Sequence, residues 1–339
     1  MVKEADIKDF NHWSEGKLQL AVGLCEKIGL IDLFNKHLEN ENGRPPDLSP
    51  GIVATIMIAS IVDTGYKPLS SFQDHFRYKD LEGIFHQPIE ISQLNDDRFG
   101  HFLDAFYEAG CRQVFMEASS LAFSEYGFKI ININYDTTSK VMWGKYETTN
   151  HLEDDGRDTS YISIDFGHSK DKRNDKKQIK VGLGTANGIV ADAKVISGNV
   201  DEKMLKEYKT QSQVEKRFRN LKCPQYMNSL FLKSPQRVEA LVYLLLIVLM
   251  ILTIAEKVVR KNLKKTKDLV IGIDRRKLKR PTLDSILRII NRVRVVSYKT
   301  ENGNIRRQIQ VLDDSCQKII KFLGISENYF AWNSKESPI

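Results

Sequence analysis

Residues 178–196 read QIKVGLGTANGIVADAKVI, and this stretch decides the fold class. Apolar residues alternate with other residues over 178–185 and again over 189–196, on the two sides of Asn187-Gly188. A period of two is typical of strands, and Asn-Gly between two such runs is the strongest short hairpin signal. The stretch therefore predicts two antiparallel strands joined by a tight turn.

Strand patterns on the N-terminal side widen this hairpin into a small sheet. In residues 129–136 apolar residues alternate with polar ones, and Asp136 lies at the predicted end of that strand. A further strand is predicted over residues 161–166. The middle of the chain is thus predicted to form a small, mostly antiparallel sheet.

Helical patterns precede the sheet. Residues 17–24 begin an amphipathic helix, and Ser49-Pro50 supplies a cap and a first-turn proline for an apolar helix over 52–62. Residues 1–125 are therefore predicted to form a helical N-terminal domain. Short helices of this kind fit a DNA-binding domain or a helical interaction domain equally well.

One apolar run invites two interpretations. The apolar run over residues 240–255 is interrupted only by Thr253 and is bounded by Glu239 and Glu256. A bilayer span needs about 20 apolar residues. We favour a buried central helix, and a single membrane span is the alternative.

The charge of the chain is unevenly distributed. Residues 260–307 hold 16 Lys or Arg against four acids, so this segment is +12, while the whole chain is +7 and the remainder is therefore −5. A basic block suits a polyanion, most simply nucleic acid, and a solvated surface is the alternative. We predict that residues 261–339 form a basic, mostly helical C-terminal region, with a helix beginning at Pro281-Thr282.

The cysteines favour a reducing compartment. Cys25, Cys111, Cys223 and Cys316 are far apart and form no Cys-x-x-Cys pair, so neither a zinc site nor a disulfide framework is expected. The first residues show no apolar signal-peptide core. We therefore expect a cytoplasmic protein without a membrane partner.

A second group of candidate residues follows a helical spacing. Tyr208, Gln211 and Glu215 fall on one helix face, and Lys222 lies two turns further along it. A carboxylate with polar and cationic neighbours suits a metal ligand beside phosphate contacts. An amphipathic surface helix with ion pairs is the alternative.

These residues resemble the Tyr-Arg-Glu-Lys signature of a large branch of bacterial and archaeal insertion-sequence transposases. Gln211 stands where that signature has Arg. The resemblance extends over roughly residues 125–295. Further blocks resemble the same family in the same order, at residues 136–138, 166–178, 197–201 and 231–240.

The resemblance implies a DDE catalytic triad on an RNase H-like fold within residues 126–260. Asp136 would be the first carboxylate and Glu215 the third, and with a second Asp they would hold two Mg²⁺ or Mn²⁺ ions. Implied contacts to DNA phosphates are Tyr208, Gln211, Lys222, Lys170 and Arg173. The implied partners are double-stranded DNA, specifically the terminal inverted repeats of the element, and a second copy in a homodimer.

The second catalytic Asp is missing from the expected place. It should follow the hairpin on a parallel strand, yet Asn199 is only nine residues from Tyr208. A crossover to a parallel strand needs about a dozen residues. Asp165 and Asp192 precede that point and match nothing in the family. We therefore predict an α+β protein with an incomplete RNase H-like core and no transposition activity. The alternative is a non-catalytic DNA-binding remnant.

Overall fold

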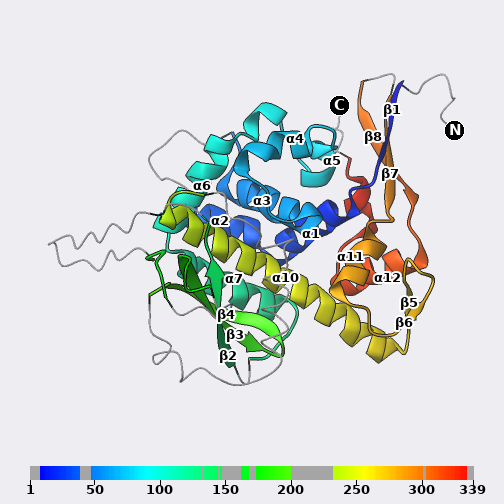
Figure 1. The fold of residues 1–339 in the computed structure, drawn as a ribbon. Helices are drawn as coiled ribbons and strands as arrows, with labels where there is room; N and C mark the ends of the chain where they lie inside the picture. The colour runs from blue at the N-terminus through cyan, green and yellow to red at the C-terminus, as the bar shows by residue number, and fades with distance from the viewer. Residues whose placement is uncertain are drawn as a thin grey trace.

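The computed structural model describes residues 8–38, 47–130, 133–143, 146, 162–167, 173–199, 232–300 and 303–333. Side chains are described for all of these except Lys8 and Asp136. Helices and antiparallel sheets together give an α+β arrangement (Figure 1), which confirms the predicted fold class at this level.

From Gly16 to Glu125 the N-terminal part is helical, as the sequence predicted, whereas residues 8–13 of the same predicted helical domain form a strand. α1 (Gly16–Ile28) ends at Gly29, which adopts the left-handed conformation at φ 82°. The Ser49 side chain caps α3 (Pro50–Thr64) by accepting a hydrogen bond from the Ile52 amide. The other elements of this part are α2 (Leu30–Leu38), η2 (Leu69–Ser71), α4 (Phe72–Phe76), α5 (Leu81–Phe85), η3 (Ile91–Gln93), α6 (Asp96–Glu108) and α7 (Cys111–Glu125).

One long helix, α10 (Pro235–Thr266), runs diagonally through the molecule (Figure 1). All residues of the segment 240–256 are buried, because α3, α6 and α7 pack against this helix. Among the helices that the structure describes, α10 alone is long and apolar enough to cross a membrane by itself. α3 and the η2–α4 segment reach the same length and hydropathy only as a pair, which is bent by 81°. Protein buries 94% of the apolar window of α10, which supports the interpretation as a central core helix.

The predicted hairpin is confirmed. β3 (Gln178–Ala186) and β4 (Ile189–Ser197) are joined by Asn187 and Gly188, with φ 53° and 70°, the left-handed pair of a type I′ turn. β2 (Asn134–Val141) pairs with β3, so the sheet order is β2-β3-β4 and every pairing is antiparallel. β4 packs on α10, and the Val195 amide of β4 donates a 3.3 Å hydrogen bond to the Tyr243 hydroxyl of α10.

Two strand predictions need correction. Asp136 does not end its strand: β2 pairs with β3 as far as Val141, and Asp136 lies opposite Leu183. The polar residues after Asp136 include threonines, which have high β propensity and do not interrupt a backbone ladder. Within residues 162–167, the region of the other predicted strand, only Asp165 forms a bridge, to Gln178.

The C-terminal region was predicted to be mostly helical, and this too needs correction. α11 (Leu283–Ile290) begins after the Thr282 cap as expected, but the rest of the region contains strands as well as helices. These are β5 (Val270–Ile271), β6 (Lys277–Leu278), β7 (Arg294–Lys299), β8 (Ile305–Val311), α12 (Asp314–Leu323) and η5 (Glu327–Ala331). β7 pairs with β8 and also with β1 (Lys8–Trp13), from the other end of the chain. No local pattern indicates a partner so distant in sequence, which is why the prediction missed this sheet.

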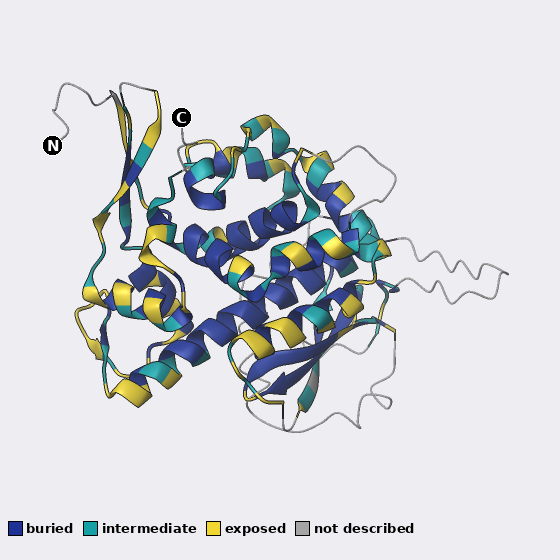
Figure 2. Ribbon diagram, turned by 180° about the vertical axis from the view of Figure 1, so that it is seen from behind, coloured by how far each residue is buried: buried dark blue, intermediate teal, exposed yellow. Residues whose placement is uncertain are grey.

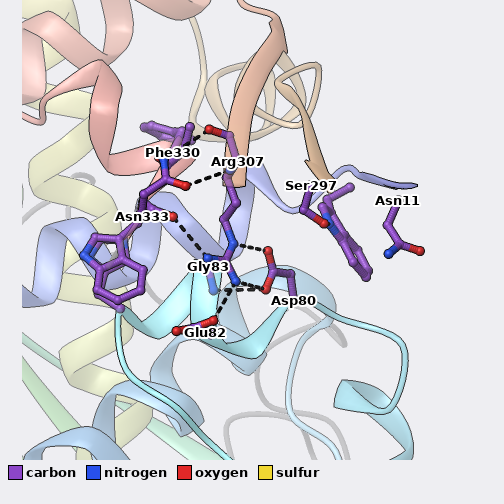
Figure 3. Close-up of polar contacts among 12 residues, drawn as sticks. Asn11, Asp80, Glu82, Gly83, Ser297, Arg307, Phe330 and Asn333 are labelled. Atoms are coloured by element: carbon purple, nitrogen blue, oxygen red, sulfur yellow. Dashed lines mark hydrogen bonds and ion pairs between the residues drawn. The ribbon is translucent and has the colours of Figure 1, made fainter. Parts of the chain in front are cut away.

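A buried ion cluster attaches the β1-β7-β8 sheet to the helical part (Figure 3). Arg307 of β8 donates to both carboxylate oxygens of Asp80, at 2.6 and 2.7 Å, and to Glu82 at 3.0 Å. It also donates to the backbone oxygen of Trp332. Because Asp80 caps α5 through the Gly83 amide, the cluster joins β8, α5 and the end of the described chain.

Candidate nucleic-acid interface

The predicted carboxylate site is only partly covered by the structure. Asp136 is the third residue of β2, and only its backbone is described. Five of the predicted site residues lie outside the described residues: Glu215, Tyr208, Gln211, Lys222 and Lys170. Arg173 lies among the described residues.

No metal-binding cluster is formed by the residues that the structure describes. Among them, no group of three or more His, Cys, Asp or Glu side chains could hold a metal ion. Asp192 is already engaged: it accepts a 2.6 Å hydrogen bond from the Tyr135 hydroxyl and lies 3.4 Å from Arg112. Asp165 accepts from the amide of Phe166 at 2.7 Å. Neither aspartate belongs to a cluster of metal ligands, and the two carboxylates that the resemblance implies as ligands, Asp136 and Glu215, have no described side chain.

A basic groove opens at the C-terminal end of α10. It has a volume of about 860 Å³, and both the last turns of α10 and the segment before α11 contribute to it. Figure 2 shows α10 changing from buried to exposed toward this end. Besides Leu263 and Asp268, the lining consists of seven cationic side chains: Lys257, Arg260, Lys261, Lys264, Lys267, Lys279 and Arg280.

Buried contacts hold the two sides of the basic groove together. The Arg260 guanidinium lies 2.7 Å from Glu256 and donates to the backbone oxygen of Pro281 at 2.7 Å. Glu256 is 3% exposed and also accepts from the Leu283 amide at 3.2 Å. This carboxylate therefore joins α10 to the start of α11, so that the groove is a built feature of the fold.

The groove cations differ from the other cations of the basic block in their partners. Arg276 is paired with Asp274 at 3.0 Å and Arg288 with Asp284 at 2.8 Å. In contrast, the exposed cations of the groove form no ion pair with any acid in the described part of the chain: Lys261, Lys264, Lys267, Lys279 and Arg280. Uncompensated positive charge along a groove attracts an anionic ligand.

The single acid in the lining does not cancel this charge. A backbone hydrogen bond from Leu269, and then the Lys318 ammonium, lower the pKa of Asp268 below its ordinary value. The Lys318 nitrogen lies 3.0 Å from the Asp268 carboxylate, so this acid is neutralised from outside the groove. The groove keeps a net positive charge.

A second hollow, which we call the aromatic pocket, lies beside the ends of β2 and β3. It has a volume of about 360 Å³ and is lined by Met142, Trp143, Tyr146, Phe166, Asp175, Lys176 and Lys177. Arg173, predicted as a phosphate contact, lies at its rim with its guanidinium carbon 5.5 Å from the Trp143 ring centre. An ion pair with Asp175, at 2.8 Å, holds the guanidinium in place.

Sequence reasoning identified the charge of the basic groove but missed the aromatic pocket. Trp143 follows a strand and Phe166 precedes a lysine-rich stretch, and neither belongs to the predicted site residues. Aromatic residues among lysines and arginines are a signal for nucleic-acid binding. That signal was present around Trp143 and over residues 166–177, in two segments that the sequence itself does not bring together.

Comparison with known proteins gives one match. The family described as Domain of unknown function (DUF4277), which is typically found in transposase-like proteins, matches residues 11–120. The matched residues run from β1 into α7 and include neither Asp136 nor the basic groove. No curated protein and no solved structure matches the chain.

Proposed function

We propose that the chain binds duplex DNA as a derivative of a DDE insertion-sequence transposase and does not itself catalyse transposition. The basic groove is the observation that carries the proposal. Its exposed cations have no acidic partners among the described residues, and Glu256 fixes the elements that present them. Lysine and arginine side chains that neutralise DNA phosphates release counterions, and this release drives binding.

Transposase ancestry is supported by two independent observations. The ordered sequence blocks resemble the insertion-sequence family, and residues 11–120 match a domain family found in transposase-like proteins. The antiparallel β2-β3-β4 sheet, with Asp136 in β2, is compatible with the incomplete RNase H-like core that the resemblance implies. Under this proposal the natural ligand is the terminal inverted repeat of the parent element.

The groove is tested by DNA binding with matched charge reversals. The triple variant Lys261→Glu, Lys264→Glu, Lys279→Glu should weaken binding to a labelled duplex by more than about tenfold at low salt, because phosphate contacts are lost. The control triple Lys36→Glu, Arg77→Glu, Lys233→Glu changes the net charge equally at exposed positions outside the groove. It should keep most of the affinity.

The outcomes separate the groove from the rest of the surface. Wild-type affinity should fall steeply between about 50 and 200 mM salt. If the control triple loses as much affinity as the groove triple, DNA does not bind through the groove. If the wild-type protein binds no duplex at low salt, the proposed function is wrong. Comparing an inverted-repeat duplex with a shuffled one then measures sequence preference.

Catalysis is tested separately. We expect no strand transfer of a labelled element end with Mg²⁺ or Mn²⁺, because the stretch between Asn199 and Tyr208 is too short for the parallel strand that would carry the second Asp. Asp201, which lies in this stretch, belongs to the block that resembles the end of the hairpin in the family. A covalently joined product from the purified protein would contradict the deletion hypothesis while leaving DNA binding intact.

A further inference from the structure

Trp143 and Phe166 are large aromatic residues that stay half exposed at the edge of the aromatic pocket. Trp143 is 59% exposed and Phe166 is 53% exposed. Beneath them, Met142 and Tyr146 are buried and form the floor. Two half-exposed aromatic rings that line one hollow with buried apolar residues leave apolar surface open to solvent, as expected of a binding site.

The local fold brings Trp143 and Phe166 to the lining of the same pocket. The Met142 amide donates to the Lys177 backbone oxygen at 2.8 Å, so the β2–β3 pairing continues to Met142 and Trp143 leaves the sheet directly after it. Phe166 follows Asp165, which bridges to the first residue of β3. Both aromatic residues are therefore anchored by backbone hydrogen bonds at the same end of the sheet.

Three cations surround the rings. The Lys176 nitrogen lies 5.1 Å from the Trp143 ring centre, and Arg173 approaches the same ring. The Lys177 nitrogen lies 5.9 Å from the Phe166 ring centre. Aromatic faces that stack on bases, with cations beside them for phosphates, are the combination used by proteins that bind single-stranded nucleic acids.

We propose that the aromatic pocket binds an unpaired nucleobase of single-stranded or locally melted nucleic acid. The base stacks on the exposed faces of Trp143 and Phe166. Lys176 contacts a flanking phosphate, and Arg173 does so while keeping its ion pair with Asp175. The Lys177 ammonium donates to the Tyr146 backbone oxygen and adds positive charge beside the Phe166 ring. The volume of about 360 Å³ falls in the ordinary range of small-ligand pockets. A base inside an intact duplex is stacked between its neighbours and does not reach such a pocket. The inference rests on the proposed DNA-binding function and adds a second surface to the basic groove.

The test uses the full chain and three labelled probes: a duplex, an oligothymidine of about 15 nucleotides and an oligouridine of the same length. Trp143→Ala should weaken oligothymidine binding by about tenfold or more, since each stacked base contributes strongly. Duplex affinity should stay within about twofold, because duplex binding relies on the basic groove. Trp143→Phe, which keeps an aromatic ring, should restore most of the loss.

Matched controls exclude a general effect of removing an aromatic residue. Tyr78 is 83% exposed and lies far from the aromatic pocket in sequence, so Tyr78→Ala should bind all three probes like wild type. Tryptophan fluorescence should fall when oligothymidine is added to the wild type, and this quenching should be weaker for Trp143→Phe. Thermal unfolding verifies that each variant is folded.

The results distinguish failure of the pocket from failure of the proposed function. If Trp143→Ala and Phe166→Ala both bind oligothymidine as tightly as wild type, the pocket proposal is wrong, whereas duplex binding stands. If the wild type binds the duplex but neither oligonucleotide, the same conclusion follows. If it binds none of the probes, the proposed function fails as well. Between the two oligonucleotides, the tighter one identifies DNA or RNA as the source of the unpaired base.

Discussion

Arg307 and Lys264 both come from the basic block, yet their surroundings are opposite. The Arg307 side chain is 2% exposed and is paired with Asp80 and Glu82 (Figure 3). Lys264 is exposed in the basic groove and has no ion pair with any acid that the structure describes. Residues of the same charge, contributed by one segment of the sequence, therefore have two different uses.

The difference shows that the net charge of a segment overstates what a ligand can use. Buried arginines such as Arg307 are committed to the fold, because removing a partner leaves an uncompensated buried charge. Exposed lysines without acidic partners cost little to keep and remain available to an anion. Changes in the two regions should therefore affect different measurements, stability in one and DNA affinity in the other.

The largest effect is expected from Arg307→Ala. The substitution leaves Asp80 and Glu82 without their cation and disconnects β8 from α5, so the free energy of unfolding should fall by about 3–5 kcal/mol. Urea denaturation measures it. The matched control is Arg276→Ala, which removes an exposed ion pair with Asp274 and should cost less than about 1 kcal/mol. Equal losses from both variants would show that the Arg307 cluster contributes no more than a surface pair.

A smaller and pH-dependent effect is expected at Glu15, which is 8% exposed near the Arg307 cluster. Burial raises the pKa of this carboxyl from 4.5 to about 8, with Lys79 opposing the shift and Asp80 adding to it. The folded state then holds a proton that the unfolded state releases, so this contribution to stability is complete below about pH 4.5 and is lost as the pH rises toward 8.

Glu15→Gln should remove this loss, because the amide stays neutral. The variant should be more stable than wild type by about 1 kcal/mol or more at pH 8 and nearly equal to it at pH 4.5. Thermal unfolding across that pH range measures the difference, and Glu327→Gln, at an exposed position, is the control. A constant difference between Glu15→Gln and wild type at every pH would rule out the titration of Glu15 as its cause.

The smallest effect is expected from a single neutralisation in the basic groove. Lys264→Gln should weaken duplex binding a few-fold and reduce the slope of log affinity against log salt by about 1, as for one lost phosphate contact. Its stability should stay within about 0.5 kcal/mol of wild type. Lys265, the next residue on α10, is exposed but does not line the groove. Lys265→Gln should leave the slope unchanged, and equal changes in both variants would mean that the groove does not select among surface lysines.

The candidate site was predictable from the sequence only to the extent that it is local. The basic block was visible as composition, and Arg173 was named as a phosphate contact. The sequence did not indicate that Arg173 lies over Trp143, because the turn before β3 and the two residues after β2 become neighbours only when the two strands pair. Nor could it separate paired from unpaired cations, since the acid that pairs with Arg307 is 227 residues away.

The sequence by itself determined the elements whose signals lie within a few residues. The Ser49 and Thr282 caps, the Asn187-Gly188 turn and the apolar run of α10 each specify local backbone geometry through side chains close in sequence. Tertiary structure decided which strands and charges meet. Trp13 of β1 donates to Ser297 of β7 across 284 residues, and a pairing at that separation depends on the packing of everything between them. The same packing buries Arg307 and leaves Lys264 open, and so decides which cations stabilise the fold and which can bind DNA.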